Sequence, residues 1–277
     1  SFAKEIVEDK LSVKMLVPVA ESIHGYEATS QDMIDIENAK LFLFTSLDID
    51  TWITNPDTIG GDDTIVLNMS DALIYETIDT VSDETTDEHD HGEDAHYWVD
   101  PSNAIYMVEY ILEGIIEIDP DESDFYTQNA EALIGRIEAK SNEMLTYFNT
   151  LDNNSLTIYV AGHNAFALLG EHFGLNMTSI FDEYEPDADI TSSELINFVS
   201  DVLDAQTHYI FIEALEAPTS ANAIKTELKN NNDFDLTILK LYAYQNVTQD
   251  QYDSFLTYVD FMEMNFQNIK LALGDNL

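Results

Sequence analysis

The sequence predicts an α/β protein made of two lobes, each containing a parallel β-sheet flanked by helices, with one long helix joining the lobes. Strand-like apolar runs alternate with segments of helical periodicity along nearly the whole chain, and one helical segment is longer than a small lobe requires. The 277 residues are enough for two hydrophobic cores. We therefore expect an N-terminal lobe over 1–118, a linking helix over 119–150 and a C-terminal lobe over 151–277.

The N-terminal lobe is expected to alternate strands with helices. Its strand-like runs lie near residues 11–17, 41–45 and 64–68. Its helical segments lie near residues 2–9, 31–40 and 102–118. Asp100 and Pro101 start the last of these helices, because Asp caps helices and Pro is accepted in the first turn. The chain opens as if in the middle of a helix, so we expect that a preceding segment has been removed.

A long helix is expected to follow the first lobe. Asp119-Pro120-Asp121-Glu122 provides an Asp N-cap, a proline in the first turn and a glutamate at the third helical position. Helix-forming residues then continue to about Phe148. At a rise of 1.5 Å per residue, such a helix spans about 40 Å, which is longer than one small lobe. This length indicates a connector between lobes.

The C-terminal lobe repeats the alternation of strands and helices. Its strand-like runs lie at residues 156–161, 176–180, 209–212 and 237–241. The last helical segment, 249–273, carries apolar residues at helical spacing and ends at Gly274. This stripe predicts a helix face in the core and not a cofactor-binding segment. Its members are Tyr252, Phe255, Leu256, Val259, Met262, Phe266, Ile269 and Leu273.

Acidic residues dominate the charge, with 54 Asp and Glu against 10 Lys and Arg and a formal net charge of −44. Nucleic acid is excluded as a partner, because phosphate backbones are bound through Lys and Arg. Salt relieves self-repulsion of this size, so the charge indicates either a salt-rich habitat or a solubilising surface. No apolar run approaches the roughly 20 residues that span a bilayer. Without cysteine, any transition metal must be held by nitrogen and oxygen ligands.

Three histidines stand after apolar runs or before helical ones, where an α/β protein presents ligands at the carboxyl ends of its strands. They are His24, His96 and His163. Zn²⁺ prefers four tetrahedral ligands and often takes three from the protein, so these histidines predict a metal site. Trp98 and Asp100 follow the second histidine and would restrain its backbone. We expect a structural role for Asp100.

The same segments resemble those of the zinc and manganese solute-binding proteins of bacterial ABC transporters, over nearly the whole chain. The matching segments run from Pro18 to Ala28, from Ala95 to Pro101 and from His163 to Leu175, in the family's order and spacing. Trp52, Glu213 and Pro218 match as well. The family begins with a strand before its first helix, and this chain lacks that strand. This agrees with the expectation that a preceding segment has been removed.

The resemblance implies that His24, His96 and His163 are the metal ligands. Manganese members typically carry glutamate at the third position, so a histidine there favours Zn²⁺ over Mn²⁺. The family's fourth ligand, usually an aspartate and sometimes a histidine, follows the last strand. Residues 241–247 contain neither an acid nor a histidine. Water would then complete the shell with help from a neighbouring polar side chain, and the candidates are Tyr242, Tyr244 and Gln245.

The acidic segment 82–95 contains two further histidines, His89 and His91. Its composition is typical of a solvated charge run. It also resembles a shortened form of the loop rich in histidines and acids that zinc members carry, which implies weak capture of metal and transfer to the tight site. The two remaining histidines, His172 and His208, are expected on a helix and at a strand start, and we interpret both as structural.

The resemblance implies an extracytoplasmic binding protein, a cell-surface lipoprotein or a periplasmic protein, that captures Zn²⁺ between two lobes and delivers it to an ABC transporter permease. It would be a monomer that is peripheral to the membrane through the removed N-terminal segment. A manganese-binding member of the same family is one alternative. A zinc hydrolase also uses an open fourth position, but no His-Glu-x-x-His motif or general base is evident, so we expect no enzyme. A surface adhesin with structural zinc is the third alternative.

Overall fold

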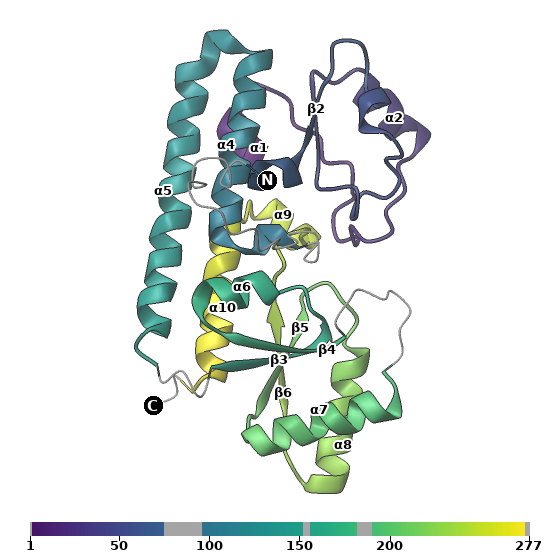
Figure 1. Ribbon diagram of the computed structural model, residues 1–277, viewed down its shortest axis with the longest axis vertical. Helices are drawn as coiled ribbons and strands as arrows, with labels where there is room; N and C mark the ends of the chain where they lie inside the picture. The colour runs from purple at the N-terminus through teal and green to yellow at the C-terminus, as the bar shows by residue number, and fades with distance from the viewer. Residues whose placement is uncertain (1, 75–95, 152–155, 182–189, 275–277) are drawn as a thin grey trace, which may run out of the picture. The chain divides into compact units, whose positions relative to one another are not determined.

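The computed structural model describes residues 2–74, 96–151, 156–181 and 190–274 (Figure 1). The chain forms two compact units, Ser1–Ala139 and Lys140–Leu277. The boundary falls within helix α5 (Ser123–Phe148), which a short 3₁₀ turn, η4 (Pro120–Glu122), precedes. Each unit contains a parallel sheet flanked by helices, which confirms the predicted α/β class. No helix in these ranges is both long and apolar enough to cross a membrane.

The described part of the N-terminal unit contains one sheet, in which β1 (Leu41–Phe44) pairs in parallel with β2 (Ile65–Asn68). Its helices are α1 (Phe2–Val7), α2 (Ser30–Glu37) and α4 (Pro101–Ile118). Its 3₁₀ turns are η1 (Pro56–Thr58), η2 (Met69–Ile74) and η3 (Tyr97–Val99).

Alternation along the strands places this sheet between two helices. Phe42 and Phe44 are buried with Ile36 of α2 on one face. On the other face α4 comes so close that a side chain at Gly114 would begin 2.7 Å from the Leu67 side chain. Glycine is therefore needed at this approach.

Residues 11–17, predicted to form a strand, are outside the sheet in the described structure. Val13 and Met15 are exposed, whereas Leu16 packs partly buried against the cluster of Ile36, Phe42 and Phe44, so the segment does not bury one alternating face as a strand would. Lys14 instead directs its ammonium group to acids of α2, Asp32 and Asp35. Side-chain hydrogen bonds and ion pairs therefore hold this segment. It forms no strand, because no neighbouring strand in the described part of the chain offers backbone groups for it to pair with.

The described part of the C-terminal unit contains a four-stranded sheet in the order β4-β3-β5-β6, and every pairing is parallel. The strands are β3 (Thr157–His163), β4 (Asn176–Phe181), β5 (Tyr209–Glu213) and β6 (Thr237–Leu241). The helices are α6 (Ala167–Phe173), α7 (Ser192–Ala205), α8 (Thr219–Asn232), α9 (Gln249–Asp253) and α10 (Tyr258–Ala272). The predicted strand-helix alternation of this lobe is confirmed.

Both faces of this sheet are buried, as expected for parallel strands. Ile210 and Ile212 point to the side where α7 and α8 contribute to the core, and Phe211 between them is buried on the opposite side. Parallel strands end at a common edge, so the last residues of β3, β5 and β6 lie along one edge of the sheet. They are His163, Glu213 and Leu241.

The last predicted helix is wrong as a single element, because it is divided into α9 and α10. Phe255 has a left-handed backbone with φ of 55°, and Thr257 caps a new helix in a capping box with Asp260. Tyr252 and Phe255 are exposed as a result, so they are not part of the core. The rest of the stripe behaves as predicted at Met262, Phe266 and Ile269, which are buried.

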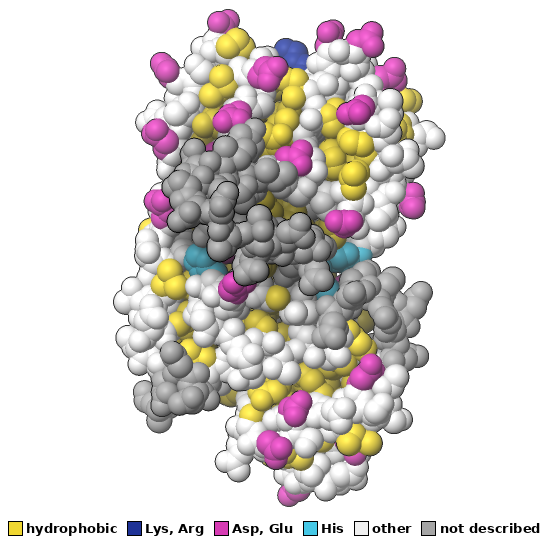
Figure 2. Space-filling view, in the orientation of Figure 1, with side chains coloured by type: hydrophobic (Ala, Val, Ile, Leu, Met, Phe, Trp, Pro, Cys, Tyr) yellow, Lys and Arg dark blue, Asp and Glu magenta, His cyan; other side chains and the backbone are white. Residues whose placement is uncertain are grey.

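The acidic composition is visible on the surface. Figure 2 shows Asp and Glu side chains scattered over the visible face, with far fewer Lys and Arg among them. The acids do not gather into a single patch in this view. Such a distribution suits either of the two explanations of the net charge, a salt-rich habitat or a solubilising surface.

Candidate metal centre

The N-terminal unit brings two of the predicted ligands together. The Nε2 atoms of His24 and His96 are 3.1 Å apart, and their rings are tilted at 57° with centroids 5.1 Å apart. Two ligands of a tetrahedral zinc, each bonded at 2.0–2.1 Å, are separated by about 3.3 Å. The two imidazoles therefore have the spacing of neighbouring ligands of one ion.

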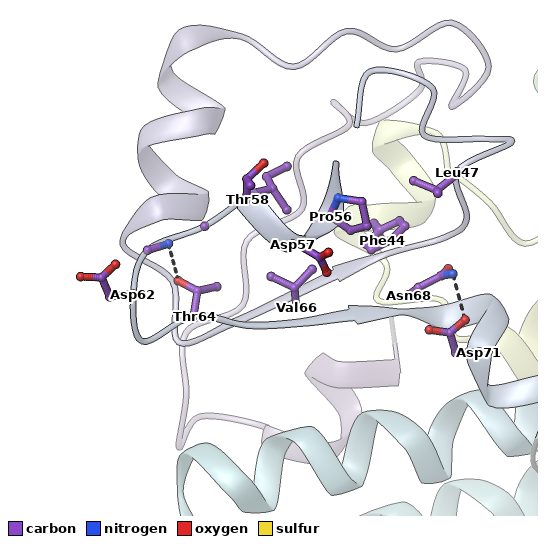
Figure 3. A pocket seen from close by; sticks show the side chains of 13 residues that line it. Phe44, Leu47, Pro56, Asp57, Thr58, Asp62, Thr64, Val66, Asn68 and Asp71 are labelled. Atoms are coloured by element: carbon purple, nitrogen blue, oxygen red, sulfur yellow. Dashed lines mark hydrogen bonds between the residues drawn. The ribbon is translucent and has the colours of Figure 1, made fainter. Parts of the chain in front are cut away.

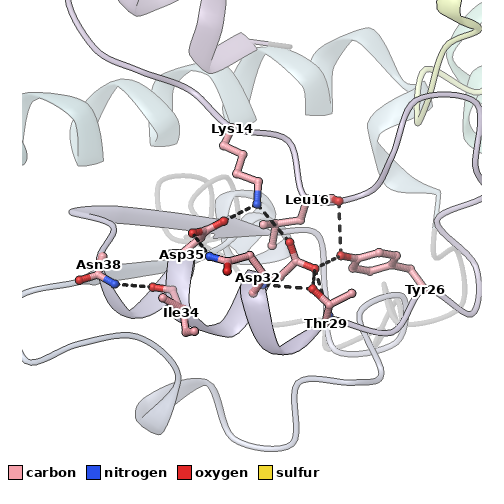
Figure 4. A network of polar contacts seen from close by, with 9 residues as sticks. Lys14, Leu16, Tyr26, Thr29, Asp32, Ile34, Asp35 and Asn38 are labelled. Atoms are coloured by element: carbon pink, nitrogen blue, oxygen red, sulfur yellow. Dashed lines mark hydrogen bonds and ion pairs between the residues drawn. The ribbon is translucent and has the colours of Figure 1, made fainter.

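His24 lies in a loop before α2 and not at the end of a strand, because the strand predicted before it does not form. The next residue, Gly25, has φ of 76°, a left-handed conformation that glycine adopts readily. Tyr26 then anchors the loop: its hydroxyl lies 2.9 Å from Asp32 Oδ2 and 3.3 Å from the Leu16 carbonyl (Figure 4). The loop thus gets its shape from side-chain hydrogen bonds.

Asp32 is the centre of this network and is only 6% exposed. Its Oδ2 accepts hydrogen bonds from the backbone N and the hydroxyl of Thr29, at 3.0 and 2.6 Å. Lys14 adds an ion pair at 3.2 Å to Oδ1 (Figure 4). These donors, with the Thr29 hydroxyl first, hold the pKa of Asp32 well below its ordinary value. Burial, and then the hydrogen bond to the Asp32 carboxylate, raise the pKa of Tyr26 to about 12.

His96 lies directly before η3 and is 4% exposed. The Trp98 ring packs edge-on against its imidazole, with centroids 5.4 Å apart. The Tyr97 hydroxyl donates to the carbonyl of Thr45 just after β1, at 2.6 Å, which ties the turn to the sheet. Asp100 accepts from the backbone N of Ser102 at 2.7 Å and caps α4, so its predicted structural role is confirmed.

Burial tunes the first imidazole for metal binding. It lowers the pKa of His24 to about 4, because the charged form loses its hydration. The ring is therefore neutral at neutral pH, and a neutral imidazole is the form that binds a metal.

In the C-terminal unit His163 closes β3, at the carboxyl end of a parallel strand as predicted. Its Nε2 lies 3.6 Å from Oε2 of Glu213, the last residue of β5. The pair meets because β3 and β5 are neighbours, with Val160 opposite Phe211. The two side chains are 7% and 6% exposed.

Glu213 matches the family in the sequence but is not among the predicted site residues, and the structure places it beside His163. Its Oε1 accepts from Nε2 of Gln245, whereas its Oε2 is buried and has no hydrogen-bond partner among the described residues. Burial, and then the nearby Glu216 carboxylate, raise the pKa of Glu213 to about 8. The available signal was an acid closing the apolar run Tyr209-Ile-Phe-Ile-Glu213.

The three candidates for a fourth ligand have different surroundings. The hydroxyl of Tyr244 accepts from Asn265 at 3.0 Å, and desolvation by burial raises the pKa of this tyrosine. Tyr242 packs its ring on Phe261, with centroids 5.2 Å apart. Of the three, Gln245 is the one that bonds to the acid beside His163.

Two further described histidines, His172 and His208, make contacts of their own. His172 lies on α6 and forms a hydrogen bond with Ser141 at 2.8 Å. His208 precedes β5, stacks on Phe234 and bonds through Nδ1 to the Asp235 carbonyl at 2.7 Å. Both are on the expected elements. The two histidines of the acidic segment, His89 and His91, lie outside the described residues.

The described part of the N-terminal unit has hollows at two places that bear on the site. One includes His24, Tyr26 and Asp32 in its lining. The other lies between η1 and the end of β2 and contains no predicted ligand (Figure 3). One of its acids, Asp71, accepts a local hydrogen bond from the side-chain amide of Asn68 at 3.1 Å. The hollow with the histidine is the one that suits a metal.

Comparison with known proteins identifies related sequences along the whole chain. Residues 1–272 match the family described as zinc-uptake complex component A, periplasmic. The chain is 25% identical over 283 residues to the high-affinity zinc uptake system protein ZnuA of Bacillus subtilis, covering 98% of this chain and 84% of that protein. It is 25% identical over 271 residues to the manganese-binding lipoprotein MntA of Halalkalibacterium halodurans, with coverages of 98% and 84%.

A third relative is longer than this chain. The zinc-binding lipoprotein AdcA of Streptococcus pneumoniae is 24% identical over 284 residues, which are 97% of this chain and 53% of that protein, so the chain spans about half of it. Among solved structures, the periplasmic zinc-binding protein TroA of Treponema pallidum matches with a TM-score of 0.79 at 19% identity. That match covers 98% of this chain and 94% of the other. It confirms the predicted fold.

Proposed function

Because the chain belongs to the zinc-uptake complex component A family, we propose that it is an extracytoplasmic solute-binding protein that captures Zn²⁺ and delivers it to the permease of an ABC transporter. The observation that carries this proposal is the His24–His96 pair, whose Nε2 atoms have the spacing of two zinc ligands. The metal is cargo here, so the role is binding and release and not catalysis.

The proposed ligands are His24 and His96 from the N-terminal unit and His163 from the C-terminal unit. Two imidazoles alone leave half of a tetrahedral shell to be filled, and a third nitrogen donor suits Zn²⁺. Since the ligands come from both units, release to the permease requires one unit to withdraw its ligands. That step must be driven by the partner, because lost ligands weaken binding.

Manganese is the alternative cargo, and the relative named as manganese-binding supports it. Mn²⁺ favours carboxylate and water over imidazole, whereas the proposed donors are mainly imidazoles. Competition between the two ions for the purified protein decides this point. We expect Zn²⁺ to displace Mn²⁺ at equal concentration, and displacement of Zn²⁺ by Mn²⁺ would reverse the assignment.

The cellular setting follows the relatives. The family is described as periplasmic, and two relatives are named as lipoproteins. We propose that the chain works outside the cytoplasmic membrane, as a monomer held at or near the membrane by a lipid anchor or free in the periplasm. Fractionation of cells that express the full-length protein tests this placement.

The ligand proposal predicts a large loss of zinc affinity on removal of any one imidazole. His24→Ala, His96→Ala and His163→Ala should each weaken binding by about 100-fold or more, since water or a poorer donor must refill the shell. Titration calorimetry in the presence of a competing chelator measures the affinity. His208→Ala is the matched control, because that ring stacks on Phe234 and bonds to a backbone carbonyl. Unchanged affinity in one of the three variants removes that residue from the ligand set.

A further inference from the structure

We propose that Glu213 is a metal ligand of the C-terminal unit, and that Gln245 holds its carboxylate in the binding orientation. This inference rests on the proposed function, because it takes His163 to be a zinc ligand. It assigns the fourth position of the shell, for which the segment after β6 supplies neither an acid nor a histidine.

The order of the strands brings the carboxylate to the right edge of the sheet. β5 lies between β3 and β6, and Glu213 is in register with Leu241 at the end of β6. A ligand expected after β6 is therefore replaced by one that closes the neighbouring strand. Its Oε2 lies 3.6 Å from Nε2 of His163, close to the separation of about 3.3 Å for two ligands of a tetrahedral zinc.

The hydrogen bonds of the carboxylate leave one oxygen available. Oε1 is occupied by the amide of Gln245, and Oε2 has no hydrogen-bond partner in the described part of the chain although it is buried. Buried carboxylates are normally paired or bound to a metal, because an unpaired one is costly. The amide oxygen of Gln245 is also buried and without a partner in the same part of the chain. A cation would suit these two buried acceptors, Oε2 of Glu213 and Oε1 of Gln245, because neither receives a hydrogen bond in the described part of the chain.

The competing explanation is that Glu213 only orients His163. Histidine ligands often donate their second ring N–H to a carboxylate, and such partners tune affinity without touching the metal. A ligand and an orienting residue differ in one observable. Binding of a metal through one oxygen widens the separation between the antisymmetric and symmetric stretching bands of a carboxylate, whereas loss of a proton alone gives the separation of a free carboxylate.

The test combines zinc affinity with infrared difference spectra of the intact protein, with and without Zn²⁺. The variants are Glu213→Gln, which keeps the shape and removes the charge, and Gln245→Ala, which removes the amide. Glu216→Gln is the control, because that acid is partly buried nearby on the same connection after β5. Thermal melts of the metal-free variants verify that each one folds.

We expect the wild-type protein to show zinc-dependent carboxylate bands with the widened separation of a metal-bound carboxylate, which Glu213→Gln abolishes and Glu216→Gln retains. Affinity should fall at least about tenfold in Glu213→Gln and by a smaller factor in Gln245→Ala. If Glu213→Gln keeps both these bands and the affinity, the inference is overturned. A loss of affinity in Glu213→Gln, with zinc-dependent bands in the wild type absent or at the separation of a free carboxylate, overturns it too, in favour of an orienting role.

The outcome for the proposed function is separate. A wild-type protein without tight zinc binding refutes the proposed function itself. Tight binding that depends on His163 and not on Glu213 leaves the proposed function standing and removes only the inference about the fourth ligand.

Discussion

The two units present their proposed metal ligands on different kinds of scaffold. In the N-terminal unit His24 and His96 stand on a loop and a 3₁₀ turn, which side-chain hydrogen bonds and aromatic packing hold in place. In the C-terminal unit His163 and Glu213 close adjacent strands of a sheet whose two faces are buried. Similar donor atoms are thus presented by a side-chain network in one unit and by backbone pairing in the other.

The His24–His96 pair and the His163–Glu213 pair also differ in their protonation. Burial lowers the pKa of His24 to about 4 and raises the pKa of Glu213 to about 8. In both cases burial disfavours the charged form. The imidazole is therefore ready to bind a metal at neutral pH, whereas the carboxyl must lose a proton. We expect the N-terminal pair to be sensitive to the network that holds it, and the C-terminal pair to be sensitive to pH.

The largest effect should come from breaking the network of the N-terminal unit. Asp32→Ala removes the buried acceptor that Thr29 and Tyr26 share, and leaves their part-buried donors without it. We expect a loss of about 2–4 kcal/mol in the free energy of unfolding, together with weaker zinc binding through His24. Denaturant unfolding and calorimetry measure the two effects.

Asp35→Asn is the matched control for this variant. Asp35 also pairs with Lys14 but lies at the surface, where solvent screens the ion pair, so a much smaller change in the free energy of unfolding is expected than for Asp32→Ala. If both variants cost the same, Asp32 is not the centre of the network, and the contrast between the two scaffolds weakens.

An intermediate effect is expected from Glu213→Gln in the metal-free protein, and it should depend on pH. The carboxyl has an ordinary pKa of 4.5 when unfolded and about 8 when folded, so the folded state retains a proton that the unfolded state has released between these values. Stability of the wild type therefore falls as pH rises through this window, by at most about 1.4 kcal/mol per pH unit from this group. The Glu213→Gln variant does not lose stability in this way, because the glutamine side chain does not titrate.

Thermal melts at pH 5 and pH 8 measure this difference. We expect metal-free Glu213→Gln to gain stability relative to the wild type at pH 8 compared with pH 5. Glu194→Gln serves as control, because that acid caps α7 on the surface and its pKa is lowered, first of all by the bond from the Thr191 backbone. A difference between wild type and Glu213→Gln that does not change with pH would contradict the burial of this carboxyl.

The smallest effect is expected from alanine substitutions at two glycines whose backbone φ angles are nearly the same. Gly25 beside His24 has φ of 76°, Gly174 at the end of α6 has φ of 68°, and an added Cβ would meet no atom within 4 Å at either position. Alanine should cost about 1 kcal/mol of stability at each, because left-handed backbone disfavours a side chain. Only Gly25→Ala should also weaken zinc binding, by a few-fold. Equal zinc affinities in the two variants would show that the loop tolerates the strain without moving the histidine.

Much of the fold could be predicted because its signals are local. Asp100 and Pro101 start α4 as expected, and the strands of the C-terminal unit appear where apolar runs predicted them. The errors arose where the outcome depended on neighbours. Residues 11–17 have a strand-like pattern but no strand pairs with them, and the apolar stripe of the last helix continues through Phe255, where the backbone turns left-handed.

The sequence by itself determined the chemistry that the site can use. The lack of cysteine restricts a transition metal to nitrogen and oxygen ligands, the scarcity of Lys and Arg excludes nucleic acid, and three ordered motifs indicated the histidines. The tertiary structure decided which side chains meet within each unit. His24 and His96 are 72 positions apart, and His163 meets Glu213 because β5 pairs with β3. Strand order and loop shape depend on contacts distant in sequence, so no local pattern contains them.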